Sequence, residues 1–246
     1  MPSGKAPLEV RLKARQPAIA METSLHRDLK RFYGDEDVQF EVPLGAHRID
    51  VIAGGRLVEI QLGSLATIRD KVRVLLKDHR LVVVKPIIVQ KTLIRRANKG
   101  GPVTHRRKSP KHGTILDLFD ELVHFTQVFP HPRLTLEVPL IDVEEWRYPG
   151  HGRRRRWRQG DYQVEDQHLT AVHETHCFRT AADLARLIQC PLPAQFHTGH
   201  LAQSLRIPRW MAQRIAYCLR QTGAARDVGK EGNARLYKFT AKRKAA

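Results

Sequence analysis

The sequence predicts an α/β protein that ends in three helices and a hairpin. Between residues 20 and 96, some stretches alternate apolar and polar residues as strands do, and others repeat apolar residues every three or four positions as helices do. After Phe178, three helical patterns precede two short strand patterns. The chain also carries 43 Lys and Arg against 25 Asp and Glu, a net charge of +18. These observations predict a folded protein that attracts polyanions.

Residues 20–96 are expected to form a helix, three strands, a helix and a strand. Thr23 or Ser24 can cap the first helix, Leu25, Leu29 and Phe32 line one of its faces, and Gly34 can end it. Strands are expected at 38–44, 47–53 and 56–62, with Gly54-Gly55 as the turn between the last two. Ser64 can cap the second helix, and Pro86 is expected to bend the strand over 80–90 or limit it to a sheet edge. The apolar stripe of the second helix comprises Leu65, Ile68, Val72, Leu75 and Leu76.

In the middle of the chain, the sequence predicts a larger share of loop residues than in the first part. Residues 95–113 are basic and interrupted by Gly and Pro, which favours a loop. A short helix is expected over 114–125 and one or two strands over 133–146. Residues 148–161 predict a loop with four consecutive arginines, and the acidic stretch 161–176 predicts a connector.

The last part of the chain predicts helices at 180–189, 198–205 and 208–223. Thr180 and Thr198 are the expected caps of the first two, and Pro208 opens the third. Strands at 224–229 and 234–240, joined by residues 230–233, complete the order of a winged helix. We therefore divide the chain into a flexible leader (1–19), a main domain (20–176) and a C-terminal domain (177–246).

Composition also bears on where the protein works. No apolar run approaches the roughly 20 residues that span a bilayer, and residues 1–19 lack the apolar core of a secretory signal. Three cysteines without CxxC spacing imply neither a disulfide framework nor a zinc knuckle. A cytoplasmic, nucleoid-associated protein with no membrane partner is the expectation.

The stretch "HRIDVIAGGRLVEIQL" (47–62) places two carboxylates opposite each other. If Gly54-Gly55 form a two-residue turn, Asp50 faces Glu59 across the two strands, with Cβ atoms roughly 5 Å apart. Two such carboxylates repel each other unless a positive group lies between them. A hard divalent cation such as Mg²⁺ would remove the repulsion, because it binds one or two carboxylates together with waters and phosphate. Alternatively, Arg48 neutralises Glu59 in an ordinary surface ladder.

The element order, with "RID" ending at Asp50 and "EIQ" running from Glu59 to Gln61, resembles the PD-(D/E)XK nuclease superfamily over residues 20–96. The resemblance implies a restriction endonuclease-like core in which Asp50 and Glu59 bind Mg²⁺ or Mn²⁺. It also implies that Gln61 positions the attacking water, and that Glu22 of the first helix joins the site.

The chain departs from the pattern of that superfamily at two positions. Gln61 stands where a lysine is usual, and Ile49 stands where a proline usually precedes the aspartate. Some restriction enzymes of the superfamily use glutamine at this position, whereas other members carry the lysine on the following helix. In this chain Arg69, Lys71 and Arg73 are available on that helix, and Lys71 is the expected catalytic lysine. A solvated helix face is the alternative for these three residues.

The basic segments favour a nucleic-acid partner. On the third C-terminal helix, Met211, Ile215, Cys218 and Leu219 are expected to pack inward and to leave polar side chains for a DNA groove. A winged helix can also bind proteins, but the charge of residues 177–246 favours DNA. The expected nucleic-acid-binding residues are Arg106, Arg107, Lys108, Arg153, Arg154, Arg155, Arg156, Arg209, Gln213, Arg214, Lys230 and Arg235.

The sequence thus predicts a Mg²⁺-dependent nuclease that hydrolyses DNA phosphodiester bonds. An inactive DNA-binding regulator on the same fold is one alternative, which Gln61 favours. An RNA-binding protein is another, because net charge does not distinguish RNA from DNA. A homodimer is compatible with cutting two strands, although no residue of the sequence shows it.

Overall fold

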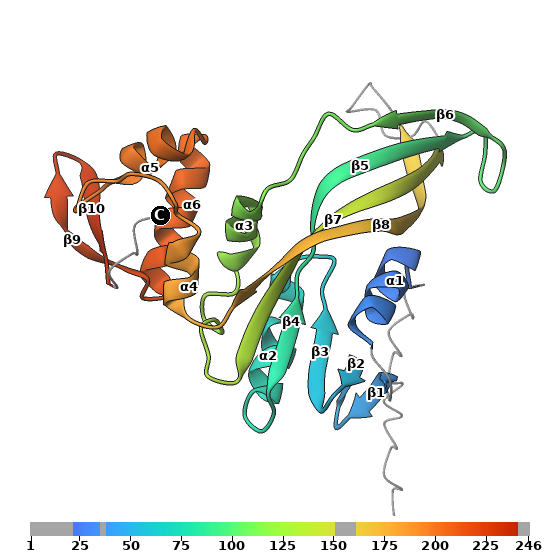
Figure 1. Cartoon of the computed structure of the whole chain (residues 1–246), viewed down its shortest axis with the longest axis horizontal. Helices are drawn as coiled ribbons and strands as arrows, with labels where there is room; N and C mark the ends of the chain where they lie inside the picture. The colour runs from blue at the N-terminus through green and yellow to red at the C-terminus, as the bar shows by residue number, and fades with distance from the viewer. Residues whose placement is uncertain (1–21, 35–37, 151–160, 241–246) are drawn as a thin grey trace, which may run out of the picture.

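The computed structural model describes residues 22–34, 38–150 and 161–240. These residues form a large mixed sheet with helices on both faces, followed by three helices and a separate two-stranded hairpin (Figure 1). The expected α/β class is therefore confirmed. The expected leader, residues 1–19, lies outside the described residues.

The predicted elements of residues 22–96 form. Helix α1 (Ser24–Tyr33) begins at the Thr23 cap, ends at Gly34 and buries Leu25 and Leu29. Strand β1 (Gln39–Leu44) pairs antiparallel with β2 (His47–Ala53), which pairs antiparallel with β3 (Arg56–Ile60). The 3-10 helix η1 (Leu65–Ile68), capped by Ser64, and α2 (Arg69–Leu75) then lead into β4 (Leu81–Val84), parallel to β3. One expectation is wrong, because Phe32 is 51% exposed.

The two layers of helices cover opposite faces of the sheet. Because side chains alternate along a strand, Val82 and Val84 of β4 pack with α1, whereas Leu81 and Val83 pack with α2. The expected apolar stripe of the second helix is buried in full.

Residues 87–178 extend the sheet into an arm of long strands, which Figure 1 shows projecting beyond α1. Strand β5 (Ile87–Arg96) follows β4 after a break at Pro86, and both pair parallel with β7 (Leu134–Pro149). Strand β6 (Val103–Lys108) pairs with β5, and β8 (Tyr162–Phe178) pairs with the other side of β7. Pro86 thus divides one predicted strand into two.

Two predicted loops of the middle region are strands instead. The basic segment 95–113 contains β6, and the expected connector 161–176 lies in β8. Both strands were missed for the same reason. All six residues of β6 are exposed, and β8 buries little apart from Phe178, so neither carries the apolar alternation by which a strand is recognised.

The C-terminal part contains α4 (Ala181–Arg186), α5 (Thr198–Leu205), α6 (Arg209–Gln221), β9 (Ala225–Glu231) and β10 (Ala234–Phe239). Three helices and a hairpin therefore form as expected. Thr180 caps α4 as predicted, but His197 and not Thr198 caps α5, because the His197 ring accepts from the backbone N–H of Gly199 and His200.

The C-terminal helices share a core with the sheet. Helix α3 (Leu118–Leu122), preceded by the 3-10 helix η2 (Ile115–Asp117), lies between them (Figure 1). One apolar cluster runs from Val72 of α2 through Phe119 of α3 to Ile215 of α6. The expected inward face of the third helix is confirmed, since Met211, Ile215, Cys218 and Leu219 are all buried.

Candidate active site

Asp50 and Glu59 lie at the end of the β2–β3 ladder. The ladder has the expected register, with Ala53 opposite Arg56 and Val51 opposite Val58. The turn works because both Gly54 and Gly55 have positive φ angles, +52° and +73°. At the next position the backbone N–H of Ile60 donates to Oδ2 of Asp50 at 2.7 Å. The paired ladder ends at Val51 and Val58, one position before the two carboxylates, and the charge of Asp50 acts on Glu59 from nearby.

Glu59 is buried, with 6% of its surface exposed. Burial raises the pKa of its carboxyl to about 7, the negative charge of Asp50 adds to this, and Lys71 partly offsets it. Its Oε1 accepts from Lys71, but its Oε2 has no hydrogen-bond partner among the described residues. A buried carboxylate oxygen without a partner is costly and needs a physical explanation.

Lys71 of α2 is the basic residue that enters the site. Its Nζ lies 2.5 Å from Oε1 of Glu59 and 2.5 Å from the carbonyl oxygen of Arg48. Arg69 and Arg73, the other two candidates on this helix, pair with Asp70 instead. The structure thus selects Lys71 from the three, as expected. The alternative ladder does not form, because Arg48 lies 3.7 Å from Glu41.

His26 of α1 connects Glu22 to Asp50. Its Nδ1 lies 3.0 Å from Oε1 of Glu22, and its Nε2 lies 3.2 Å from the Ile60 carbonyl and 3.4 Å from Oδ2 of Asp50. Burial acts to lower the pKa of His26, but the Asp50 carboxylate raises it overall. Burial likewise acts to raise the pKa of Asp50, whereas His26 and the Ile60 N–H hold it below its usual value. Glu22 therefore reaches the site through His26.

Lys30, one turn beyond His26, completes this side of the site. Its buried ammonium lies 2.6 Å from Oε1 of Glu22 and also pairs with Glu41. Burial acts to raise the pKa of Glu22, but Lys30 and His26 lower it overall. Glu41 has a φ angle of +53°, an uncommon conformation for a residue with a side chain. Sequence reasoning missed His26 and Lys30, which lie four residues apart on one face of α1. Glu22 was expected on this helix, but it precedes the Thr23 cap and reaches both side chains from outside the helix.

Gln61 holds the turn that follows β3. Its Nε2 donates to the Ser64 carbonyl at 3.0 Å and to Oγ1 of Thr67 at 2.8 Å. Lys85, the residue after β4, supports the same turn, since its Nζ donates to the carbonyls of Leu62 and Gly63 at 3.1 and 2.5 Å. The amide nitrogen of Gln61 is therefore engaged within the turn, beside Glu59 and not between the two carboxylates.

The arrangement can hold a cation with two carboxylates. Within residues 22–34, 38–150 and 161–240, no three His, Cys, Asp or Glu side chains form a metal-binding group. Mg²⁺ does not need three, because it takes one or two carboxylates and completes its shell with water and phosphate oxygens. Asp50 and Glu59, with the unpaired Oε2 of Glu59, fit this requirement.

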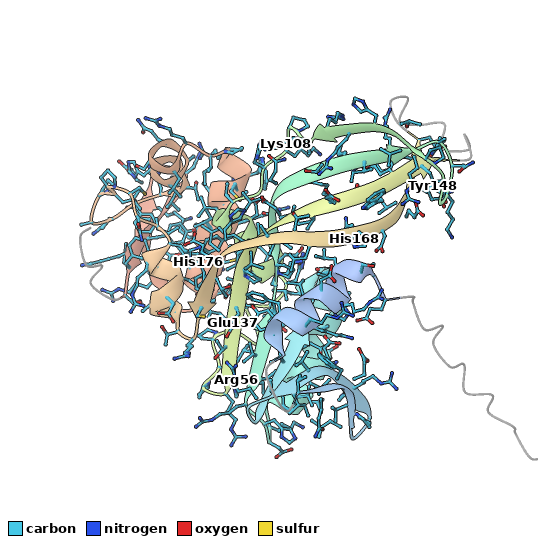
Figure 2. The ribbon with its side chains drawn as sticks, turned by 45° about the vertical axis from the view of Figure 1, so that its right-hand side comes forward. Arg56, Lys108, Glu137, Tyr148, His168 and His176 are labelled. Atoms are coloured by element: carbon cyan, nitrogen blue, oxygen red, sulfur yellow. The ribbon has the colours of Figure 1, made fainter. Side chains whose placement is uncertain are left out.

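The expected nucleic-acid-binding residues of the sheet lie on its exposed edge. Arg106, Arg107 and Lys108 belong to β6, and Arg106 pairs with Glu144 of β7 at 2.6 Å. Figure 2 shows Lys108 on the upper side of the arm. Arg153, Arg154, Arg155 and Arg156 lie outside the described residues.

The C-terminal candidates lie on α6 and on the hairpin. Arg209 and Gln213 are exposed, whereas Arg214 pairs with Asp120 of α3 at 2.7 Å and stacks 4.9 Å over Trp210. Lys230 and Arg235 face each other in the β9–β10 ladder, where Arg235 pairs with Asp227 at 2.9 Å. Of these five, Arg214 and Arg235 are therefore engaged by acidic neighbours.

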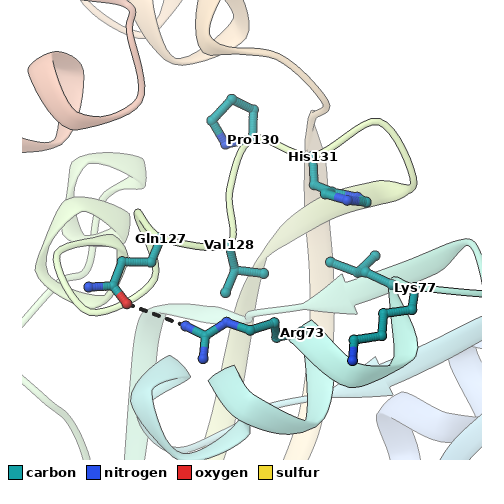
Figure 3. A pocket seen from close by; sticks show the side chains of 7 residues that line it. Arg73, Lys77, Gln127, Val128, Pro130 and His131 are labelled. Carbon is teal, nitrogen blue, oxygen red and sulfur yellow. Dashed lines mark hydrogen bonds between the residues drawn. The ribbon is translucent and has the colours of Figure 1, made fainter.

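A small cavity of about 170 Å³ lies between α2 and the segment after α3 (Figure 3). Arg73 enters it and donates to Oε1 of Gln127 at 3.3 Å. The cavity shares no lining residue with the candidate site at Asp50 and Glu59, and Arg73 is engaged by Gln127 and Asp70. Along the described chain, no helix is both long and apolar enough to cross a membrane.

Comparison with known proteins finds one similar protein sequence and one matching protein family. A protein of Treponema pallidum (strain Nichols), described as "Uncharacterized protein", is 30% identical over 219 residues, which cover 88% of this chain and 85% of the relative. No solved structure matches the chain. Residues 23–179 match the family described as "Domain of unknown function (DUF8091)", a range that begins at the α1 cap and ends just before α4. The chain belongs to the DUF8091 family.

Proposed function

We propose that the protein is a Mg²⁺-dependent nuclease that hydrolyses DNA phosphodiester bonds. In this proposal α1, β1–β3, α2 and β4 are a restriction endonuclease-like core, and α4–α6 with β9–β10 are a winged-helix-like unit that holds DNA. The observation that carries the proposal is the buried Glu59, with one oxygen on Lys71, the other without a partner, and Asp50 on the adjacent strand.

The chemistry divides between the chain and the cation. Asp50 and Glu59 would hold Mg²⁺, or Mn²⁺ in its place, which when bound lowers the pKa of a water and stabilises charge on a phosphate. Lys71 supplies a fixed positive charge beside the developing phosphorane charge. His26 and Lys30 hold Glu22 and Asp50 in place from α1. Gln61 orients the attacking water with its side-chain oxygen, while its nitrogen holds the turn.

The alternative is a DNA-binding regulator on the same fold without turnover. The engaged amide nitrogen of Gln61 favours it, because that group replaces the free ammonium usual in the nuclease superfamily. Wild-type protein that binds DNA tightly but cuts no substrate would support this alternative. Preferential binding of duplex RNA over DNA would support an RNA-binding function.

The test is cleavage of supercoiled plasmid, linear duplex, single-stranded and branched DNA, and structured RNA, with Mg²⁺ or Mn²⁺. We expect Asp50→Ala and Glu59→Ala each to lower the cleavage rate by roughly 100-fold or more, because each removes one of two cation ligands. DNA affinity should stay within about twofold, since the sites that neutralise phosphates are elsewhere.

Asp70→Ala is the matched control for these variants. Asp70 is an exposed carboxylate of α2 next to Lys71, and it contacts Arg69 and Arg73. This variant should cut at the wild-type rate and bind Mn²⁺ in calorimetry as the wild type does. Cleavage that survives in both Asp50→Ala and Glu59→Ala would contradict the proposed site.

A further inference from the structure

A second cavity, of about 460 Å³, lies at the far end of the arm, where β5, β6, β7 and β8 meet. Its volume lies within the range of pockets that enclose small ligands. None of the candidate active-site residues lines this cavity, that is, neither Asp50 and Glu59 nor Glu22, His26, Lys30 and Lys71. Six lining residues carry its chemistry, namely Arg95, Arg96, Thr104, Arg147, Tyr148 and Tyr162.

The three arginines of this cavity differ in how they are paired, and Arg147 is engaged by Glu145. Arg96 has a buried Nε without a hydrogen-bond partner among the described residues, and its acidic neighbour Glu165 lies 3.6 Å away. The Arg96 guanidinium is fixed 4.4 Å over the Trp146 ring. Arg95 is exposed and forms no ion pair with any described residue. Asp161 is the acidic residue of the described lining, while Glu165 and Glu145 pair with Arg96 and Arg147 from outside it, so Arg95 carries the charge that no described carboxylate pairs with.

The aromatic rings of the cavity offer a flat surface. Arg147 lies 3.8 Å over one face of the Tyr162 ring, which orients that ring, and Tyr162 is 39% exposed. Tyr148 is held by a 2.5 Å hydrogen bond from its hydroxyl to Oε1 of Gln163. Figure 2 places Tyr148 at the extreme end of the arm. Held aromatic rings next to the exposed guanidinium group of Arg95, which forms no ion pair with a described residue, suit a planar ligand that carries a phosphate.

We propose that this cavity binds an unpaired nucleotide of single-stranded DNA, with its base stacked on Tyr162 and its phosphate at Arg95 and Arg96. A base inside a duplex has both faces covered by its neighbours, so it cannot also stack on a ring that lines a cavity. An unpaired base has a free face, and every base can stack in this way. The inference rests on the proposed function, in which the protein acts on DNA. It adds that the cavity of the arm, a site separate from Asp50 and Glu59, selects single-stranded DNA.

The test is fluorescence anisotropy with a labelled 12-nucleotide oligo(dT), with EDTA present so that cleavage plays no part. We expect Tyr162→Ala and Arg95→Ser each to weaken binding about 5- to 30-fold, the effect of losing one stacked base or its phosphate contact. Binding of a 12-base-pair duplex should change less than twofold. Tyr162→Phe should bind oligo(dT) as the wild type does, because it keeps the ring.

Arg56→Ser is the control for the loss of one positive charge. Arg56 is exposed at the start of β3, directly after the Gly54-Gly55 turn, and lies far from Tyr148 in Figure 2. It should bind oligo(dT) within twofold of the wild type. Equal losses for duplex and single strand in Tyr162→Ala would overturn the proposal, as would an unchanged affinity for oligo(dT) in both cavity variants.

Further probes distinguish single-stranded DNA from free nucleotides and RNA, and distinguish the proposed cavity from the proposed nuclease site. In competition assays, labelled oligo(dT) is displaced by unlabelled oligo(dT), by free thymidine monophosphate or by oligo(U). If either of the last two displaces it more strongly than unlabelled oligo(dT) does, the assignment to single-stranded DNA is overturned. Glu59→Gln should bind oligo(dT) normally, since it lies outside the cavity. The cavity can therefore be confirmed even if no substrate is cut, and cleavage can be confirmed even if the cavity variants bind normally.

Discussion

Glu145→Ala is expected to lower the free energy of unfolding by about 3 kcal/mol. Glu145 is 2% exposed in the middle of the arm and joins three strands. Its carboxylate pairs with Lys91 of β5 and Arg147 of β7, and accepts from Nε2 of Gln167 of β8 at 2.6 Å. Removing it leaves two positive charges without their partner. The expected loss is at the low end for such a change, because Lys91 and Arg147 retain some access to water. Urea unfolding followed by circular dichroism measures it.

Glu144→Ala is the matched control. Glu144 is the neighbouring residue of β7, its side chain points to the opposite face of the sheet, and its pair with Arg106 is exposed. An exposed pair contributes little, so the expected loss is below about 1 kcal/mol. Equal losses in the two variants would show that the Glu145 network does not stabilise the arm.

The acid dependence of stability gives the Glu145 network a second signature. Burial acts to raise the pKa of Glu145, but Lys91, Gln167 and Arg147 hold it below its usual value of 4.5. A carboxyl whose pKa is lower in the folded state stabilises the fold above about pH 4.5, and this contribution is lost as the pH falls through the folded pKa. We therefore expect Glu145→Gln to lose less stability than the wild type between pH 5 and pH 3. Parallel curves for the two proteins would contradict this.

Phe119→Ala is expected to cost about 3–5 kcal/mol, the usual effect of deleting a buried phenyl ring. Phe119 is fully buried in α3, within the apolar cluster that continues from α2 to α6. Its carbonyl also accepts from Sγ of Cys218 of α6 at 3.7 Å. Because the apolar cluster is continuous, the empty space left by the deleted ring should destabilise both the sheet and the C-terminal helices.

Hydrogen exchange can detect this coupling. Protection should fall together in α2 and α6 of Phe119→Ala, because both pack in the cluster that contains Phe119. Phe32→Ala, which removes a ring that is 51% exposed, should change stability by about 0.5 kcal/mol or less. Loss of protection confined to α4–α6 would instead indicate that residues 177–246 fold independently.

Local signals in the sequence determined much of the first part of the fold. Thr23, Ser64 and Thr180 cap helices because their hydroxyl oxygens accept from backbone N–H groups that have no partner within the first turn. Gly54-Gly55 fixed the register of the β2–β3 hairpin, because a two-residue turn leaves only one pairing of its strands. From that register, Asp50 and Glu59 could be expected near each other, whereas Lys71 was suggested only by the resemblance to the nuclease superfamily.

Tertiary structure alone decided how the site is completed and where the arm lies. The approach of His26 and Lys30 depends on α1 packing against β2 and β3. Glu59 is contacted by Lys71 of α2, and no local pattern encodes either of these tertiary contacts. The strands β6 and β8 have exposed, polar sequences, and their hydrogen bonds come from partners β5 and β7. A strand that buries few side chains is stabilised by its neighbours in the sheet, so the sequence of that strand by itself does not reveal it.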